Sequence, residues 1–191
     1  MNSCLPFPRG STMSDLGRSG ISPTAAIEPW SQILGQKYEV QDDLHSTGLP
    51  VILLVVRLET AFTTSADYFG LLYPFDADSK DFGRELQSAA ASNSAGALAV
   101  PLDDHYSKSQ ALLANDLVYV ILSGPGYGAT AASGCNLTAH DPITSGSTGR
   151  LQATIATAAQ TVLGTIDGST AAEDVNVLVF WDIDLKKEVS N

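Results

Sequence analysis

The last third of the chain, Asp116 to Trp181, is a series of short β-forming runs separated by Gly, Pro, Ser, Thr and Asp. The runs lie within Asp116–Ser123, Asp141–Leu151, Val162–Gly168 and Asp174–Trp181. Short runs at this spacing, joined by residues that favour turns, are typical of compact all-β modules. We therefore predict a mainly β fold: a small β-barrel or β-sandwich with tight turns, one or two short helices and an extended N-terminal arm.

A cluster of glycines, Gly124-Pro-Gly-Tyr-Gly128, follows the first of these runs. No Lys-Ser or Lys-Thr pair comes after it and it lacks the GxGxxG spacing, which excludes a phosphate-binding loop. Clustered Gly and Pro are the usual residues of chain reversal. We predict a tight turn that closes the Asp116 strand.

The chain divides into four segments by composition. Residues 1–29 contain four prolines and no helical or strand period, and we expect an extended arm there. Residues 30–115 are expected to form an α+β part. A β-rich module over 116–185 and a tail over 186–191 follow.

Two elements are predicted within the α+β part. The continuous apolar run at 51–58, rich in Val and Ile, indicates a buried strand. Residues 81–91 are predicted to form a helix, with Asp81 as its cap and Phe82 and Leu86 along one face.

Composition limits the classes of partner. The formal net charge is −11, which repels a phosphate backbone, so we expect no nucleic-acid partner. No run approaches the roughly 20 apolar residues of a membrane-spanning helix, and no secretory signal is evident. The two cysteines, Cys4 and Cys135, have no disulfide or metal-ligand pattern, and we expect free thiols in a reducing compartment.

Two acidic pairs lie close to histidines. Asp103-Asp104-His105 is the most enzyme-like cluster, and Asp42-Asp43 precedes His45. Carboxylates beside an imidazole are able to bind a divalent cation or to share a proton transfer. However, adjacent strand residues point to opposite faces, and neither pair has a known ligand spacing. We expect surface turns, no catalytic residue, no metal and no cofactor; the alternative is an enzyme that uses Asp103, Asp104 and His105.

Four aromatic residues lie within the segment Tyr68–Phe75: Tyr68, Phe69, Tyr73 and Phe75. One interpretation is an aromatic cluster that seals an end of the core. The other is an exposed docking patch, which we include among the partner-binding candidates. A patch of this kind would also serve a non-catalytic glycan- or ligand-binding β domain, which is our alternative function.

Three segments carry a resemblance to a known family. They are Asp116–Gly124, then Leu137–Leu151, then Val162–Gly168 continuing through Ala171–Val179. Their succession of a strand with a glycine turn, an "aGdpi…sGrl" clause and a "vlGtald…dvvVll" clause resembles the head decoration, or cement, proteins of tailed bacteriophages. His140 stands where glycine is common in that pattern, and residues 1–109 show no match.

The resemblance implies a non-enzymatic virion protein on the outer surface of the capsid, made in the host cytoplasm. Proteins of this kind bridge subunits of the major capsid protein and form homo-dimers or homo-trimers, with a β-barrel or β-sandwich and a flexible arm. In the arm region, Ile27 and Trp30 offer apolar anchors for a capsid neighbour. Trp30 is equally well interpreted as the first residue of the local core.

Overall fold

The structure is a computed structural model that describes residues 34–75, 84–87, 98–131, 137–153, 161–168 and 175–185. These residues form twelve β-strands and a short 3₁₀ turn, with no α-helix among them. The prediction of a mainly β fold is confirmed. The elements are β1 (Lys37–Gln41), β2 (Pro50–Leu58), β3 (Phe62–Thr63), β4 (Leu72–Pro74), β5 (Glu85–Leu86), β6 (Ala99–Pro101), β7 (Ala111–Leu112), β8 (Leu117–Ala129), β9 (Pro142–Ser145), η1 (Ser147–Gly149), β10 (Leu151–Ala153), β11 (Gly164–Ile166) and β12 (Asn176–Asp182).

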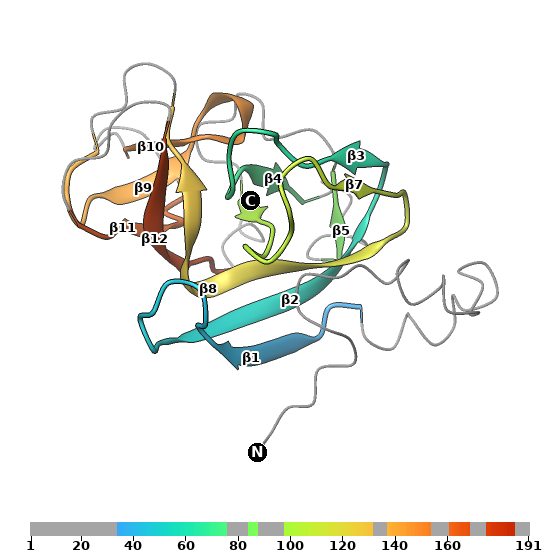
Figure 1. Cartoon of the computed structure of the whole chain (residues 1–191), viewed down its shortest axis with the longest axis horizontal. Coiled ribbons are helices and arrows are strands. Elements are labelled where there is room, and N and C mark those ends of the chain that lie inside the picture. Colours follow the sequence, from blue (N-terminus) through green and yellow to red (C-terminus); the bar gives the residue numbers. More distant parts are fainter. Residues whose placement is uncertain are drawn as a thin grey trace.

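Strand β8 is the longest element and organises the others. It runs along β2, turns sharply and continues along β12 (Figure 1). Its first half, up to Ser123, is antiparallel to β2, and its second half, from Ser123 onward, is antiparallel to β12. One strand thus belongs to two groups of strands.

The first half of β8 belongs to a closed ring of five strands. Strand β2 pairs with β8 on one side and with β5 on the other, and β4 pairs with β6. Two bridges complete the ring: Phe75 with Leu86 joins β4 to β5, and Leu102 with Val120 joins the end of β6 to β8. Closure of this kind gives a small barrel, to which β1 adds an outer strand along β2.

The second half of β8 belongs to a second ring. The strand order is β8, β12, β11, β9 and β10, and a bridge between Thr130 and Leu151 brings β10 back to the end of β8. Gly126 and Gly128 lie on β8 here. A Cβ atom on Gly126 would meet Ile121 at 2.6 Å, and one on Gly128 would meet Leu151 at 2.4 Å. The two glycines leave room for the side chains that fill this ring.

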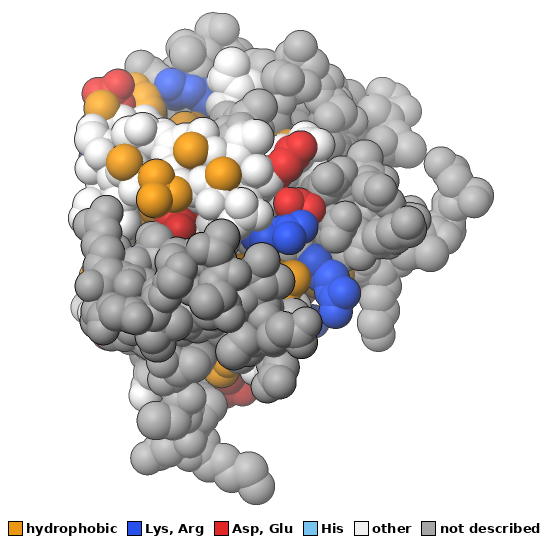
Figure 2. Space-filling view, turned by 90° about the vertical axis from the view of Figure 1, so that its right-hand side faces the viewer, with side chains coloured by type: hydrophobic (Ala, Val, Ile, Leu, Met, Phe, Trp, Pro, Cys, Tyr) orange, Lys and Arg blue, Asp and Glu red, His pale blue; other side chains and the backbone are white. Residues whose placement is uncertain are grey.

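The apolar side chains of both rings form one continuous core. The predicted strand at 51–58 is confirmed as β2, and Leu53 to Val56 are buried on both faces of the strand. Burial on both faces is the reason that this run is continuously apolar instead of alternating. In the described part of the face in Figure 2, hydrophobic side chains form separate small groups among polar atoms.

The predicted turn at Gly124–Gly128 is wrong. All five residues lie inside β8, paired with β12, and only Gly124 has a left-handed backbone (φ +104). The chain bends at Gly124 and continues as a strand. A Cβ at this position would lie 2.3 Å from the carbonyl oxygen of Pro50, so glycine is required for the close approach of β2.

The predicted helix at 81–91 also differs from the structure where its residues are described. Glu85–Leu86 is strand β5, parallel to the end of β2. The Leu86 side chain is fully buried, and Arg57 Nη2 donates to Glu85 Oε2 at 2.9 Å. Pairing with a neighbouring strand therefore outweighs the local helical pattern at these two residues. Residues 81–83 and 88–91, the arm at 1–29 and the tail at 186–191 lie outside the described residues.

The part of the chain that the structure describes contains no helix of the length and apolarity needed to cross a membrane.

Replacing Gly124 by alanine is expected to lower the free energy of unfolding by about 2–4 kcal/mol, because it combines a left-handed φ with a backbone clash. Gly48 provides a matched control, since its φ is +67 but nothing lies within 4 Å of a Cβ built there. Gly48→Ala is expected to cost only about 1 kcal/mol. Urea unfolding of both variants measures the difference, and equal losses would contradict the proposed role of the bend.

Candidate functional site

The two acidic–histidine segments of the sequence meet in space. The loop between β1 and β2 supplies Asp42, Asp43 and His45, and the segment after β6 supplies Asp103, Asp104 and His105. They lie where β8 bends: the Asp103 amide donates to the Tyr119 carbonyl before the bend, and the Tyr127 amide donates to Asp104 Oδ2 after it. We call these six side chains the acid–imidazole cluster.

The inner part of the cluster is a buried chain of three side chains. His45 Nδ1 lies 3.0 Å from Asp42 Oδ1, and His45 Nε2 lies 3.2 Å from Asp104 Oδ2. The side chains of His45, Asp42 and Asp104 are only 4%, 1% and 1% exposed. The ring of His45 also contacts the edge of the Tyr127 ring, with centroids 4.7 Å apart.

Asp42 organises the loop that carries His45. Its Oδ1 accepts the amides of Leu44 and His45, and its Oδ2 accepts the amide and the hydroxyl of Thr47. An Asp carboxylate that accepts hydrogen bonds from backbone amides two to five residues later commonly stabilises a turn. This loop carries left-handed residues at Ser46 and Gly48, which reverse the chain into β2.

The outer part of the cluster has the same form and lies nearer the surface. His105 Nε2 lies 3.2 Å from Asp43 Oδ1, and His105 Nδ1 lies 3.5 Å from Asp103 Oδ1. The side chains of His105 and Asp43 are 21% and 63% exposed. Each histidine therefore faces one carboxylate of its own segment and one of the other segment.

The surroundings change the proton affinities of the inner groups. Contact with Asp104, supported by Asp42, raises the pKa of His45 above its ordinary value, against the opposing effect of burial. Burial raises the pKa of Asp104, although His45 and the Tyr127 amide act in the other direction. Burial also opposes ionisation of Asp42, but the hydrogen bonds from His45 and Thr47 outweigh it and lower the Asp42 pKa well below its usual range. A protonated His45 and an ionised Asp42 therefore stabilise each other.

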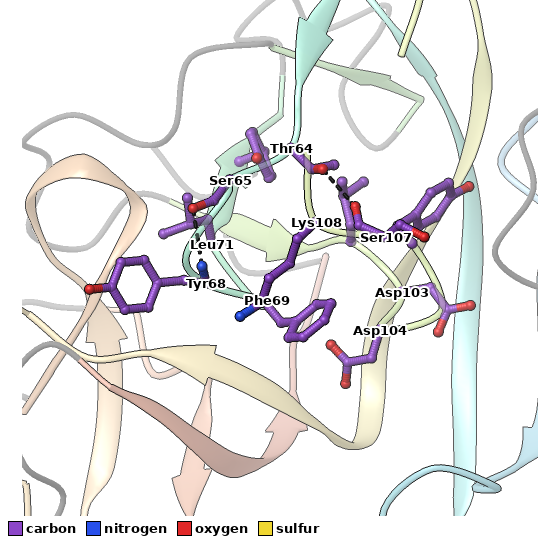
Figure 3. Close-up of a pocket in the computed structure, with 13 residues that line it drawn as sticks. Thr64, Ser65, Tyr68, Phe69, Leu71, Asp103, Asp104, Ser107 and Lys108 are labelled. Carbon is purple, nitrogen blue, oxygen red and sulfur yellow. Dashed lines mark hydrogen bonds between the residues drawn. The ribbon is translucent and has the colours of Figure 1, made fainter. Parts of the chain in front are cut away.

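The expectation of surface turns is correct for the turn and wrong for the surface. Residues 104–106 do form a turn. Taken as whole residues, however, Asp103 is only 1% exposed and Asp104 only 9% exposed. The expected alternation holds, because the carboxylates of Asp103 and Asp104 point to opposite sides (Figure 3). Each reaches a different histidine as a result. Among the described residues, no group of three or more His, Cys, Asp and Glu side chains is arranged to hold a metal ion.

The structure separates the four predicted aromatic residues. Tyr73 and Phe75 are each 5% exposed and belong to the core, which agrees with the first of the two interpretations. Tyr68 and Phe69 are half-buried, and their ring faces are covered by the Arg150 guanidinium at 4.3 Å and the Lys108 ammonium at 4.7 Å. Ile27 and Trp30 lie outside the described residues.

Tyr127 is a member of this site that the sequence analysis did not identify. Its ring stacks on Phe69 with centroids 5.9 Å apart and meets His45 on another side. A tyrosine between two glycines was assigned to a turn, so no local signal marked it. A small hollow of about 30 Å³ lies beside Phe69 (Figure 3). Its lining includes Tyr68, Phe69, Asp104 and Lys108.

His140 occupies a left-handed position, with φ +64. Glycine adopts this conformation without strain. Histidine is tolerated better than most residues in this region.

Comparison with known proteins gives a weak structural similarity. No protein-family model and no curated protein matches the chain. One similar solved structure is the N base of the head fiber gp8.5 of bacteriophage phi29, with a TM-score of 0.39 and 15% identity. The match covers 70% of this chain and 96% of that chain. A TM-score this low carries no argument about function.

Replacing Asp42 by asparagine is expected to lower the free energy of unfolding at pH 7 by about 1–3 kcal/mol, because a buried carboxylate that accepts four hydrogen bonds is lost. The neighbouring Asp43→Asn change is expected to cost less than about 1 kcal/mol, since an exposed ion pair contributes little.

The Asp42 contribution also has a defined pH dependence. A lowered pKa means that its stabilisation is present above the ordinary Asp pKa of about 3.9 and is lost as the pH falls below it. The difference between wild type and Asp42→Asn, measured by urea unfolding, should therefore shrink in acid. A difference that stays constant from pH 7 to pH 3 would refute this assignment.

Proposed function

We propose that the chain is a non-enzymatic structural protein of a bacteriophage virion, and more narrowly a capsid decoration or cement protein. In this role it binds the outer surface of the head and bridges neighbouring subunits of the major capsid protein. The observation that carries the proposal is the residue pattern of Asp116–Trp181, which resembles that of decoration proteins.

The location of this pattern in the fold supports the proposal. Its residues supply every strand of the second ring, from β8 through β12. The pattern therefore corresponds to one closed unit with a shared interior and not to scattered local similarities. A closed ring of short strands leaves few unpaired sheet edges. Because unpaired edges promote aggregation, this arrangement suits a protein that binds a specific partner.

The acid–imidazole cluster supports a non-catalytic role. Both nitrogens of His45 face carboxylates of the same chain, and its side chain is 4% exposed. A general base needs to reach a proton on a substrate within hydrogen-bond distance. His45 is enclosed by these partners, so its ring nitrogens interact with the protein itself and not with a substrate.

Charge and surface composition agree with a position outside the head. With a net charge of −11, the protein gains nothing from contact with packaged DNA.

Trp30 and Ile27 remain our proposed contacts with a capsid neighbour. A weak contact of this kind is strengthened when many copies bind one lattice.

The glycan-binding alternative receives less support. Tyr73 and Phe75 are in the core, and the faces of Tyr68 and Phe69 are covered by basic side chains. The adjacent hollow of about 30 Å³ is far below the roughly 300 Å³ of small-ligand sites.

The proposal is tested with heads assembled from the major capsid protein that is encoded together with this chain, prepared without it. The purified chain is expected to sediment with the heads, to saturate at a fixed number of copies per head and to raise the temperature at which they break. It is also expected to form a dimer or trimer in light scattering. Absence of binding, or binding with no gain in heat or shear resistance, would contradict the cement role.

A pair of variants tests the proposed arm contact. Trp30→Ala is expected to weaken head binding at least about tenfold, as for a central interface aromatic. Leu113→Ala removes an apolar side chain that is 51% exposed elsewhere on the surface, and it should bind as wild type. Equal binding by both variants would remove Trp30 from the interface.

A further inference from the structure

We propose that the acid–imidazole cluster is a pH-operated latch that fastens the β1–β2 loop to the segment after β6 and releases it as the pH rises. The inference is independent of the proposed function. It rests on the reciprocal positions of two histidines and four carboxylates, which come from segments about sixty residues apart in the chain.

The positions of the ring nitrogens favour a protonated His45. A neutral imidazole has a single N–H, whereas an imidazolium has two. Both His45 nitrogens lie within 3.2 Å of carboxylate oxygens, of Asp42 on one side and Asp104 on the other. Loss of the proton would direct a ring lone pair at one of these oxygens. When that lone pair faces Asp104, the contact between the two segments changes from attraction to repulsion.

The described groups around His45 are mainly acidic. The groups that face His45 are Asp42 of its own loop, Asp104 of the segment after β6 and the ring of Tyr127 on β8. Behind them lie Asp103, which repels Asp104, and the outer pair of Asp43 and His105. Among these described neighbours, His45 and His105 are the only groups able to carry positive charge.

The two carboxylates are held by backbone amides in the closed state. Asp42 accepts the Leu44 and Thr47 amides, and Asp104 accepts the Tyr127 amide at 2.7 Å. Both are buried, so neither reaches water without movement of a segment. The movable element is the β1–β2 loop, because the segment after β6 is anchored to β8 through Asp103 and Tyr106.

The direction of the response follows from the raised pKa of His45. A histidine whose pKa is raised by folding stabilises the closed state below its ordinary value of about 6.5, and this stabilisation is lost as the pH rises through the folded value. The latch is thus closed in mild acid and opens toward alkaline pH. Leu44 and Leu49, each 46% exposed, are carried by the loop that it releases.

The test is hydrogen exchange of the Leu44, His45 and Thr47 amides, all of which donate to the Asp42 carboxylate in the closed loop. Exchange rates divided by intrinsic rates give the opening constant of the loop, with the β2 amides as an internal reference. In the wild-type chain this constant is expected to rise by up to about tenfold per pH unit above the His45 midpoint, since one proton is released. NMR of the His45 ring in the same sample should give the same midpoint.

The variants assign the effect to a residue. His45→Gln is expected to open more readily at pH 6 and to lose the pH dependence, because a neutral amide carries no titrating proton. His140→Asn is the matched control: it removes a histidine outside the cluster, and asparagine accepts the left-handed backbone there. It should retain the wild-type profile.

Three results would overturn the latch. They are an opening constant in the wild type that does not change between pH 5 and 9, a His45→Gln variant that keeps the dependence, and a His140→Asn variant that loses it. If His45→Gln does not fold, two measurements on the wild type decide. A titration midpoint of the His45 ring in NMR that differs from the midpoint of loop opening in hydrogen exchange rejects the proposal.

Discussion

The fold depends on the bend in β8 at Gly124. One strand is able to close two rings only if it turns sharply and still pairs with its neighbouring strands. At this point only glycine accepts both the left-handed φ and the close approach of the Pro50 carbonyl. Corners in small β structures are commonly made by strands that change sheets in this way. The continuous core follows, because the interiors of the two rings meet along the same strand.

The bend also determines where the buried acids lie. Asp103 is tied to β8 before the bend and Asp104 to β8 after it, so the pair spans the corner. A buried carboxylate is costly unless it is paired and hydrogen-bonded. His45 provides the charge and the Tyr127 amide provides the hydrogen bond. The acid–imidazole cluster therefore stabilises the bend in β8. Its residues are of the types found in enzyme sites, but their role here is structural.

The sequence predicted the parts of the fold that depend on local preference. The strand at 51–58 and the strands between Asp141 and Trp181 were found because runs of Val, Ile and aromatic residues bounded by turn residues specify extended backbone over a few residues. Local preference failed at Glu85–Leu86 and at Gly124–Gly128. In both places pairing with a distant strand decided the conformation.

For the candidate site, the sequence by itself determined which residues carry charge, and that neighbours such as Asp103 and Asp104 point apart. It did not determine that His45 lies between Asp42 and Asp104, because a contact across about sixty residues exists only after the first ring has closed. Only the tertiary structure buried these acids and raised the pKa of the histidine. Burial and proton affinity are properties of the assembled surroundings and not of any local run of residues.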